Sequence, residues 1–197
     1  MTPQETAVLD LFKQTGAYLN GHFRLTSGLH SPEYLQCALV LQHTALAERL
    51  GRELAGKVRE IIGAAPVDLV ASPAIGGLIV GHEAARALGA RFVFAERAGD
   101  GKMTLRRGFT ADAGAAAVVI EDVVTTGGST REVVDLLAAS GARVLAAGSI
   151  VDRSGGQVAV GVPRAALLTL QVVAYPPDDC PLCREGLPVT KPGSRPA

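Results

Sequence analysis

Two patterns of apolar residues alternate along the chain. Leu46, Leu50, Leu54 and Val58 recur every four residues, which predicts a helix with one apolar face. Further along, short continuous apolar runs predict strands over about 67–71, 91–95, 115–120, 144–151 and 167–173. The helices between them are expected to end near 88 and to cover about 129–140. Continuous apolar strands separated by helices predict an α/β fold with a parallel sheet flanked by helices.

The two ends of the chain depart from this pattern. Thr2, Pro3 and Glu5 fit a helix start with a capping box, so a first helix is expected to reach about Thr15. A polar, glycine-marked stretch follows and predicts a short strand, a turn and a second short strand. The tail over 176–197 is rich in proline, and we expect an extended segment, either packed over the body or loose.

Length and composition indicate one globular domain over 1–197, with a core over about 60–175. Hydrophobic residues make up 48% of the chain and charged residues 19%. Basic and acidic residues both number 19, so nucleic acid is not an expected partner. The sequence shows no signal pattern and no apolar run long enough for a membrane span, and its three cysteines are too few for a disulfide framework. We therefore expect a cytoplasmic protein.

The most informative stretch follows the apolar run that ends at Ile120. Two adjacent carboxylates, Glu121 and Asp122, close the expected strand, and a small-residue loop leads into the expected helix. Glycines let backbone N–H groups approach a ligand closely, and a helix start favours an anion through its unpaired N–H groups and its dipole. The loop and helix start comprise Val123, Val124, Thr125, Thr126, Gly127, Gly128, Ser129 and Thr130.

This combination predicts a site for a phosphorylated sugar. The loop suits a phosphate monoester, whereas the two carboxylates can accept hydrogen bonds from nearby sugar hydroxyls or hold Mg²⁺ indirectly. Ribose 5-phosphate offers both groups. The sequence contains neither the dinucleotide-binding glycine motif nor a P-loop. The alternative, a plain strand-to-helix turn capped by serine or threonine, leaves the Glu121–Asp122 pair unexplained.

The stretch from Val118 to Glu132 resembles the phosphoribosyl-pyrophosphate signature of the type I phosphoribosyltransferases. The resemblance implies that Glu121 and Asp122 hold the ribose hydroxyls, that Asp122 is catalytic, and that the segment 125–129 wraps the 5-phosphate. Val123 and Val124 would also bind the donor. It also implies Mg²⁺ as a cofactor, carried by the substrate and with no direct protein ligand.

Other segments are similar to the orotate phosphoribosyltransferases within that superfamily, and the likeness runs from about 11 to 155. The segment 23–34 resembles the part that covers the base, which implies a small N-terminal hood over about 16–40. The segment 72–77 resembles the pyrophosphate loop, which implies that Gly76 and Gly77 bind the donor.

Arg153 stands at a strand end that, in this family, carries the arginine for the orotate carboxylate; Thr125 would also contact orotate. A guanidinium fork matches a planar carboxylate bidentately, whereas uracil and hypoxanthine are neutral and do not require it. The alternative is a surface arginine that is paired with Asp152.

The resemblance implies transfer of ribose 5-phosphate from phosphoribosyl pyrophosphate to orotate, giving orotidine 5'-phosphate and pyrophosphate in UMP synthesis. It further implies a homodimer with shared active sites. Two alternatives stay open: a purine or uracil phosphoribosyltransferase, and a non-catalytic regulator that binds the donor as a signal.

The segment 96–108 is basic and contains glycines, as expected of a mobile active-site lid that is too polar for the core. The family has such a loop, which reaches the neighbouring subunit's site. By that resemblance Arg97 stands at the loop base and Lys102 is the catalytic lysine, although Arg106 or Arg107 could take that role. A solvated basic turn is the alternative interpretation.

Two positions depart from the family pattern, since some members carry lysine where Thr26 and Gly76 stand. Less fixed positive charge is therefore expected near the pyrophosphate, and backbone N–H groups of Gly76 and Gly77 would serve as donors.

Cys180 and Cys183 have metal-ligand spacing. A closed zinc site needs four ligands, and no second such pair exists; Cys37 and the four histidines lie far off in sequence. The sequence therefore favours ordinary thiols in a packed tail.

Overall fold

The computed structural model describes residues 1–25 and 27–192, so Thr26 lies outside the described residues. Its main sheet has six strands in the order β5-β4-β3-β6-β7-β8, and β5 alone runs antiparallel to its neighbour. The strands are β3 (Leu69–Pro73), β4 (Arg91–Arg97), β5 (Met103–Leu105), β6 (Ala116–Val124), β7 (Arg143–Asp152) and β8 (Arg164–Thr169). The expected parallel sheet flanked by helices is confirmed.

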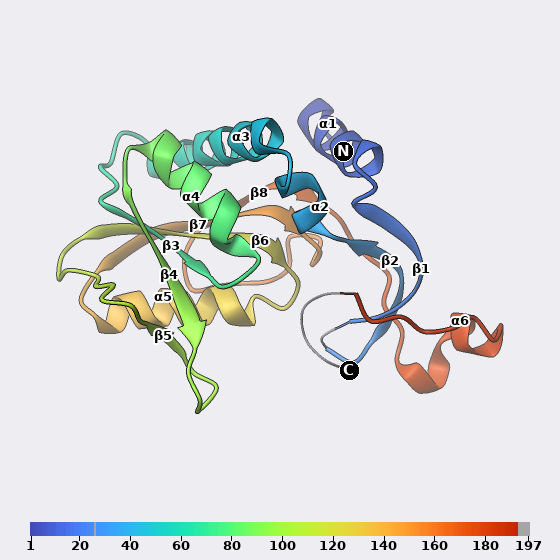
Figure 1. The fold of residues 1–197 in the computed structure, drawn as a ribbon. Coiled ribbons are helices and arrows are strands. Elements are labelled where there is room, and N and C mark those ends of the chain that lie inside the picture. The colour runs from blue at the N-terminus through green and yellow to red at the C-terminus, as the bar shows by residue number, and fades with distance from the viewer. Residues whose placement is uncertain (26, 193–197) are drawn as a thin grey trace.

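Helices cover both faces of this sheet (Figure 1). Helices α3 (Thr44–Ile62) and α4 (Gly77–Leu88) lie on one face, and α5 (Gly128–Ala139) lies on the other. Alternate side chains of β6 serve the two layers, because Val118 and Ile120 pack into one apolar cluster and Val119 into the other. The helices are α1 (Pro3–Gln14), α2 (Cys37–Leu41), α3 (Thr44–Ile62), α4 (Gly77–Leu88), α5 (Gly128–Ala139) and α6 (Pro181–Arg184).

Local sequence signals set the helix boundaries. The capping box is present, since Glu5 N–H donates to the Thr2 hydroxyl at 3.2 Å and Thr2 N–H donates to the Glu5 carboxylate at 2.7 Å. The apolar stripe of α3 faces the core, where Leu50 and Leu54 are fully buried. No helix in the described part of the chain is long and apolar enough to cross a membrane.

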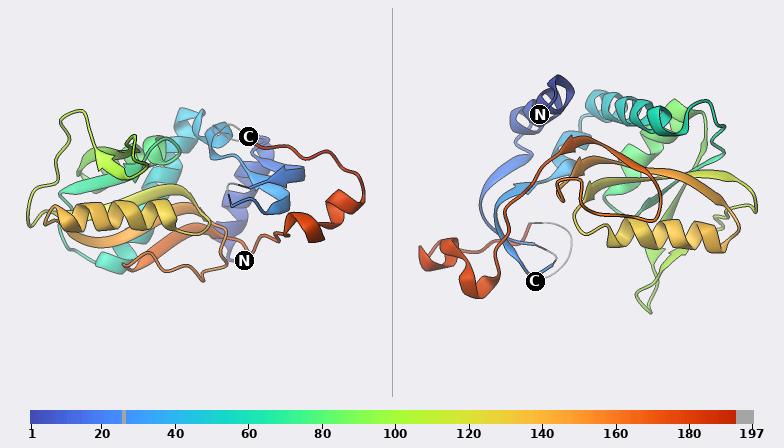
Figure 2. Two further views of the ribbon diagram at one scale, coloured as in Figure 1. Left: turned by 90° about the horizontal axis from the view of Figure 1, so that it is seen from below. Right: turned by 180° about the vertical axis from the view of Figure 1, so that it is seen from behind.

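A separate two-stranded hairpin, β1 (Tyr18–Arg24) and β2 (His30–Leu35), stands beside the main sheet. The tail runs along this hairpin, loops out and returns to it (Figure 2). The expectation of a purely extended tail is wrong, because a short 3₁₀ helix (Pro177–Asp179) and α6 interrupt it. Both pieces begin with proline, whose fixed φ and missing N–H suit the first helical turn.

The segment 96–108 is not the long loop that its polarity predicted. Residues Met103–Leu105 form the edge strand β5, which pairs with the end of β4 from Ala95 to Arg97. Met103 is buried in the cluster under α5, and this apolar contact holds the strand in place. The polar residues 98–102 form a tight turn between β4 and β5, in which Ala98 N–H donates to the Lys102 carbonyl at 2.8 Å.

Candidate active site

Strand β6 carries the carboxylate pair, Glu121 and Asp122, to the carboxyl edge of the sheet. Glu121 is only 7% exposed, and its Oε1 accepts a 3.3 Å hydrogen bond from the Asp122 N–H. Burial raises the pKa of Glu121 well above its usual value, and the charge of Asp122 adds to that rise. Burial likewise raises the pKa of Asp122. No ion pair to either carboxylate is present within the described residues. A hydrogen-bond donor or a cation brought by a ligand would therefore stabilise the ionised form of both carboxylates.

The loop between β6 and α5 ends in a glycine that the backbone requires. Gly127 has φ 71°, and a side-chain carbon there would lie 2.5 Å from Val158 Cγ1. No side chain among the described residues caps the start of α5, which leaves its first N–H groups for a ligand and disfavours the plain capped turn. Thr125 and Thr126 are exposed beside it, and Ser129 is half-buried.

The loop before α4 packs directly against the carboxylate pair. A side-chain carbon on Gly76 would lie 2.5 Å from both carboxylate oxygens of Asp122, and one on Gly77 would lie 3.0 Å from the Ile120 carbonyl oxygen. The space for a lysine at position 76 is therefore already taken by Asp122. Helix α4 begins at Gly77, so unpaired N–H groups of its first turn lie next to the carboxylates.

Arg153 follows β7 and is a buried cation. It is 9% exposed, its Nη2 donates to the Glu33 carbonyl at 3.4 Å, and its guanidinium carbon lies 6.0 Å from the centre of the Tyr34 ring. Its Nε is buried with no hydrogen-bond partner among the described residues. Burial lowers the pKa of Arg153, because the loss of solvation of the guanidinium outweighs the opposing effects of the nearby Tyr34 and Glu33.

The alternative pairing of Arg153 with Asp152 is wrong. Asp152 is held instead by Arg164 Nη2 at 2.7 Å and by the Ser154 hydroxyl at 2.6 Å. Burial works against ionisation of Asp152, but these hydrogen bonds outweigh it and lower the pKa of Asp152. Asp152, the last residue of β7, is thus fully engaged elsewhere, and Arg153 faces the hairpin with spare donors.

Tyr34 lies between the cation and the carboxylate pair and was not among the predicted site residues. Burial raises its pKa, and the charge of Asp122 raises it further while that of Arg153 lowers it. Strand β2 also carries Glu33, whose carboxylate accepts a hydrogen bond from Tyr18. Burial together with that bond raises the pKa of Tyr18 to about 12. The sequence signal for Tyr34 was its position in the segment 23–34.

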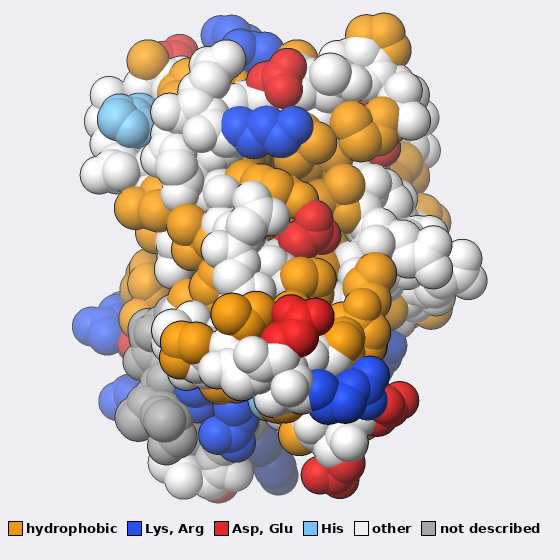
Figure 3. All heavy atoms as spheres, turned by 90° about the vertical axis from the view of Figure 1, so that its right-hand side faces the viewer, with side chains coloured by type: hydrophobic (Ala, Val, Ile, Leu, Met, Phe, Trp, Pro, Cys, Tyr) orange, Lys and Arg blue, Asp and Glu red, His pale blue; other side chains and the backbone are white. Residues whose placement is uncertain are grey.

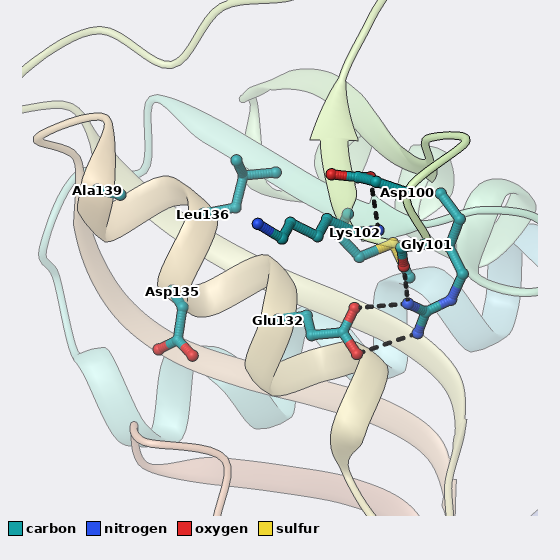
Figure 4. A pocket seen from close by; sticks show the side chains of 9 residues that line it. Asp100, Gly101, Lys102, Glu132, Asp135, Leu136 and Ala139 are labelled. Atoms are coloured by element: carbon teal, nitrogen blue, oxygen red, sulfur yellow. Dashed lines mark hydrogen bonds and ion pairs between the residues drawn. The ribbon is translucent and has the colours of Figure 1, made fainter.

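The structure does not bring Arg97 and Lys102 to the loop after β6 within this chain. Arg97 forms a two-point ion pair with Glu132 on α5, at 2.8 and 3.1 Å. Lys102 extends along α5 toward Leu136, away from the helix start (Figure 4). The two cations border a hollow of about 490 Å³ with three carboxylates around it, which suits an anion poorly. These carboxylates belong to Asp100, Glu132 and Asp135.

One further basic side chain of the segment 96–108 is also paired with an acid of its own segment. Arg107 pairs with Glu96 through two contacts of 2.9 Å.

Two groups of side chains in the described residues have ligand types for a cation. The carboxylate pair offers hard oxygen donors, which suit Mg²⁺, and a histidine–cysteine cluster lies where the tail meets the hairpin.

Comparisons with known proteins agree with this arrangement. Residues 40–161 match the phosphoribosyl transferase domain. The chain is similar to the orotate phosphoribosyltransferase of Heliobacterium modesticaldum, with 55% identity over 95% of this chain and 97% of the relative. It is 54% identical to that of Pelotomaculum thermopropionicum, over 95% of this chain and 96% of the relative. The crystal structure of orotate phosphoribosyltransferase from Aeropyrum pernix superposes with a TM-score of 0.67 at 26% identity, covering 83% of this chain and 94% of the other.

Proposed function

This chain belongs to the orotate phosphoribosyltransferase family, and we infer from that membership and from its site that it is a pentosyltransferase. It transfers the ribose 5-phosphate group of phosphoribosyl pyrophosphate to orotate. The products are orotidine 5'-phosphate and pyrophosphate, and the reaction belongs to UMP synthesis.

One observation carries the assignment to orotate. Arg153 is a buried guanidinium with no carboxylate partner among the described residues, and it lies beside Tyr34 at the edge of the phosphate loop. A buried cation without an anion is costly unless a ligand supplies the anion. The planar carboxylate of orotate meets that need bidentately, whereas a neutral base leaves the charge unpaired.

The proposed roles at the donor follow the chemistry of each group. The backbone of 125–129 and the hydroxyls of Thr125, Thr126 and Ser129 bind the 5-phosphate, with Val123 and Val124 beside the donor. The carboxylates of Glu121 and Asp122 accept hydrogen bonds from the ribose hydroxyls. Gly76 and Gly77 offer backbone N–H groups to the pyrophosphate. Thr125 contacts orotate together with Arg153.

Breaking the bond from ribose C1 to pyrophosphate leaves positive charge on the ring and moves the electron pair to the leaving group. The carboxylates of Glu121 and Asp122 then face a cationic ring, so their interaction strengthens in the transition state. Mg²⁺, carried by the donor, neutralises the pyrophosphate when bound. Tyr34 and the hairpin cover the base and exclude water from C1.

We propose that Lys102 and Arg97 act in the neighbouring subunit of a homodimer. Their turn projects from the body of the chain (Figure 1), and Lys102 is directed away from its own phosphate loop. The pair of Arg97 with Glu132 is exposed and can be exchanged for pyrophosphate at low cost. We further propose one domain over 1–197 and a cytoplasmic location.

The experiment measures the loss of orotate absorbance with phosphoribosyl pyrophosphate and Mg²⁺, alongside hypoxanthine, adenine and uracil as acceptors. We expect turnover with orotate at a rate at least about 100-fold above that with any neutral base. A neutral base would leave the buried guanidinium of Arg153 without an anion, whereas the orotate carboxylate pairs with it. Preference for a neutral base would make the chain a salvage enzyme. Donor binding without turnover on any acceptor would make it a regulator.

A further inference from the structure

Four metal-ligating side chains, distant in sequence, meet where the tail crosses the hairpin. They are His22 on β1, His30 at the start of β2, and Cys180 and Cys183 at α6. One ligand atom from each lies within 4.8 Å of those from the other three. The first three residues are buried, and Cys183 lies at the surface. We name these four residues the histidine–cysteine cluster.

The distances within the cluster match a tetrahedral ion. Cys180 Sγ lies 3.6 Å from His22 Nε2, Cys183 Sγ lies 3.7 Å from that nitrogen, and Cys183 Sγ lies 3.3 Å from His30 Nδ1. Zinc bonds of about 2.0 Å to nitrogen and about 2.3 Å to sulfur would place tetrahedral ligands about 3.3–3.8 Å apart. The two imidazole nitrogens, 2.8 Å apart, need only a small separation as the ion replaces the proton between them.

The tautomer of His22 is fixed by a backbone carbonyl. Its Nδ1 lies 2.8 Å from the Leu187 carbonyl oxygen, which can only accept, so Nδ1 carries the proton. The lone pair of Nε2 is therefore directed into the cluster. A histidine that donates its other N–H to a carbonyl is the usual arrangement at a metal site, because the bond orients the ring and raises its basicity.

The tail has little else to hold it in place. Among the described tail residues 176–192, only Cys180 is buried, while Leu187 and Val189 are 44% and 42% exposed. Backbone bonds anchor the two ends of the loop, from His30 N–H to the Tyr175 carbonyl and from Arg24 N–H to the Thr190 carbonyl, both at 2.8 Å. On the side that carries α6, surface hydrophobic side chains are interspersed with charges of both signs (Figure 3). A loop this poor in apolar burial is typical of segments held by a metal ion or a disulfide.

We propose that His22, His30, Cys180 and Cys183 hold a structural zinc ion that fastens the tail to the hairpin. Two thiolates and two neutral imidazoles balance a divalent cation, and the two thiol protons pass to solvent. Soft sulfur with imidazole in a tetrahedral set favours zinc over Mg²⁺, and four protein ligands leave no open position for catalysis. The sequence had favoured ordinary thiols because the histidines lie far off along the chain; the hairpin brings two of them to the cysteines.

The site is tested independently of orotate turnover. The full chain, purified without a histidine tag, is analysed for metals by mass spectrometry, and we expect one zinc ion per chain. Cys180→Ser and Cys183→Ser should each lower the zinc content at least about tenfold, since a closed site needs all four ligands. Matched controls are Cys37→Ala, whose thiol lies in the main apolar core, and His82→Asn, whose side chain is largely exposed. Both controls should retain the full zinc content.

A second measurement uses the unaltered chain, so it stands even if a variant fails to fold. The chelated, reduced protein is titrated with Co²⁺, and we expect the absorption bands of a tetrahedral thiolate complex, saturating at one equivalent and lost on addition of Zn²⁺. Zinc should also raise the melting temperature by about 5 °C or more, because an ion that binds only the folded chain stabilises it. Protein purified without zinc that shows no such bands with Co²⁺, or zinc content unchanged in both cysteine variants, overturns the proposal.

Discussion

Two clusters of buried polar side chains lie near the two ends of strand β2. They differ in whether the chain itself supplies partners for their polar atoms. The carboxylate pair comes from adjacent residues of β6 and has no ion-pair partner among the described residues; Glu121 is buried and Asp122 is half-buried. The histidine–cysteine cluster comes from β1, β2 and the tail, and its four ligand atoms face one another. Carboxylates without a paired cation suit a substrate that binds and is released. Four ligand atoms that face one another, with a charge that matches a divalent ion, suit a metal ion that stays bound.

Strand β2 connects the two groups. It begins at His30 in the cluster and carries Tyr34 beside Arg153 near its other end. We therefore propose a structural role for the cluster and a functional one for the carboxylate pair. Substitutions at the carboxylate edge should reduce activity with little loss of stability, and some should even stabilise the chain.

The largest effect is expected for Asp122→Asn. We expect kcat/KM to fall about 1000-fold, about 4 kcal/mol, because the carboxylate acts on charge that develops in the transition state. The melting temperature should rise by about 2–4 °C, as for about 1 kcal/mol gained when a buried like charge is removed. Asp10→Asn on α1, an exposed position, is the control and should change neither quantity. A fall in both quantities would give Asp122 a structural role.

The pH dependence of this stabilisation has a defined sign. The pKa of Asp122 is raised by folding, so above its unfolded pKa the folded chain is the state that binds more protons. The free energy of unfolding of the unaltered chain therefore falls as pH rises from the unfolded pKa of Asp122 through its raised folded pKa. The melting-temperature gap between Asp122→Asn and the unaltered chain should widen with rising pH, and it should vanish below about pH 4, where both states are protonated. A gap that narrows with rising pH would contradict the assignment.

Lys102→Ala comes next. We expect kcat to fall about 100-fold while both Michaelis constants change less than about threefold, since the contact strengthens as charge leaves with the pyrophosphate. Steady-state kinetics with Arg106→Ala as the comparison decide between the basic residues of the turn. If Arg106→Ala shows the larger loss in kcat, the catalytic role passes to Arg106.

Contiguity explains which of these residues could be predicted from sequence. The carboxylate pair, Gly127 and the start of α5 stand in one stretch, so local chemistry was enough to propose them as site residues, and the strand–helix alternation predicted the sheet. Strand β6 runs four residues past its expected end because Val123 and Val124 still pair with β7. Strand β8 starts three residues earlier than expected, where Arg164 pairs with Ala147.

Contacts between distant segments were beyond the reach of sequence patterns. The approach of His22 to Cys180, the pair of Arg97 with Glu132 and the packing of Met103 depend on the tertiary fold. Local patterns were too weak to predict them. The three residues of β5 are too few to show the alternation of a strand, and a single pair of cysteines does not indicate which other residues lie beside it.

Arg153→Gln should have a smaller and more selective effect. We expect the Michaelis constant for orotate to rise about 30-fold, near 2 kcal/mol, because a charge-assisted pair is replaced by a neutral contact. The Michaelis constant for the donor should stay within about twofold, since the contact proposed for Arg153 is with the base alone. Arg143→Gln, at the exposed start of the same strand, is the matched control. Unchanged orotate kinetics would remove Arg153 from the base site.

Gly76→Ala is expected to give the smallest change. The new carbon would lie 2.5 Å from both Asp122 oxygens, so the carboxylate must move, and we expect about a tenfold rise in the Michaelis constant for the donor. Gly56→Ala on α3 has open space around it and should leave kinetics unchanged while stabilising the chain by about 0.5–1 kcal/mol. Equal kinetics for the two variants would mean that the position of Asp122 does not matter to donor binding.

A crystal structure with phosphoribosyl pyrophosphate, Mg²⁺ and orotate tests the assignment of the carboxylate edge most directly. We predict the 5-phosphate on the backbone of 125–129, the ribose hydroxyls at Glu121 and Asp122, and the orotate carboxylate on Arg153. Density for the donor at any other place, with the loop after β6 unchanged and Arg153 still unpaired, would contradict the account.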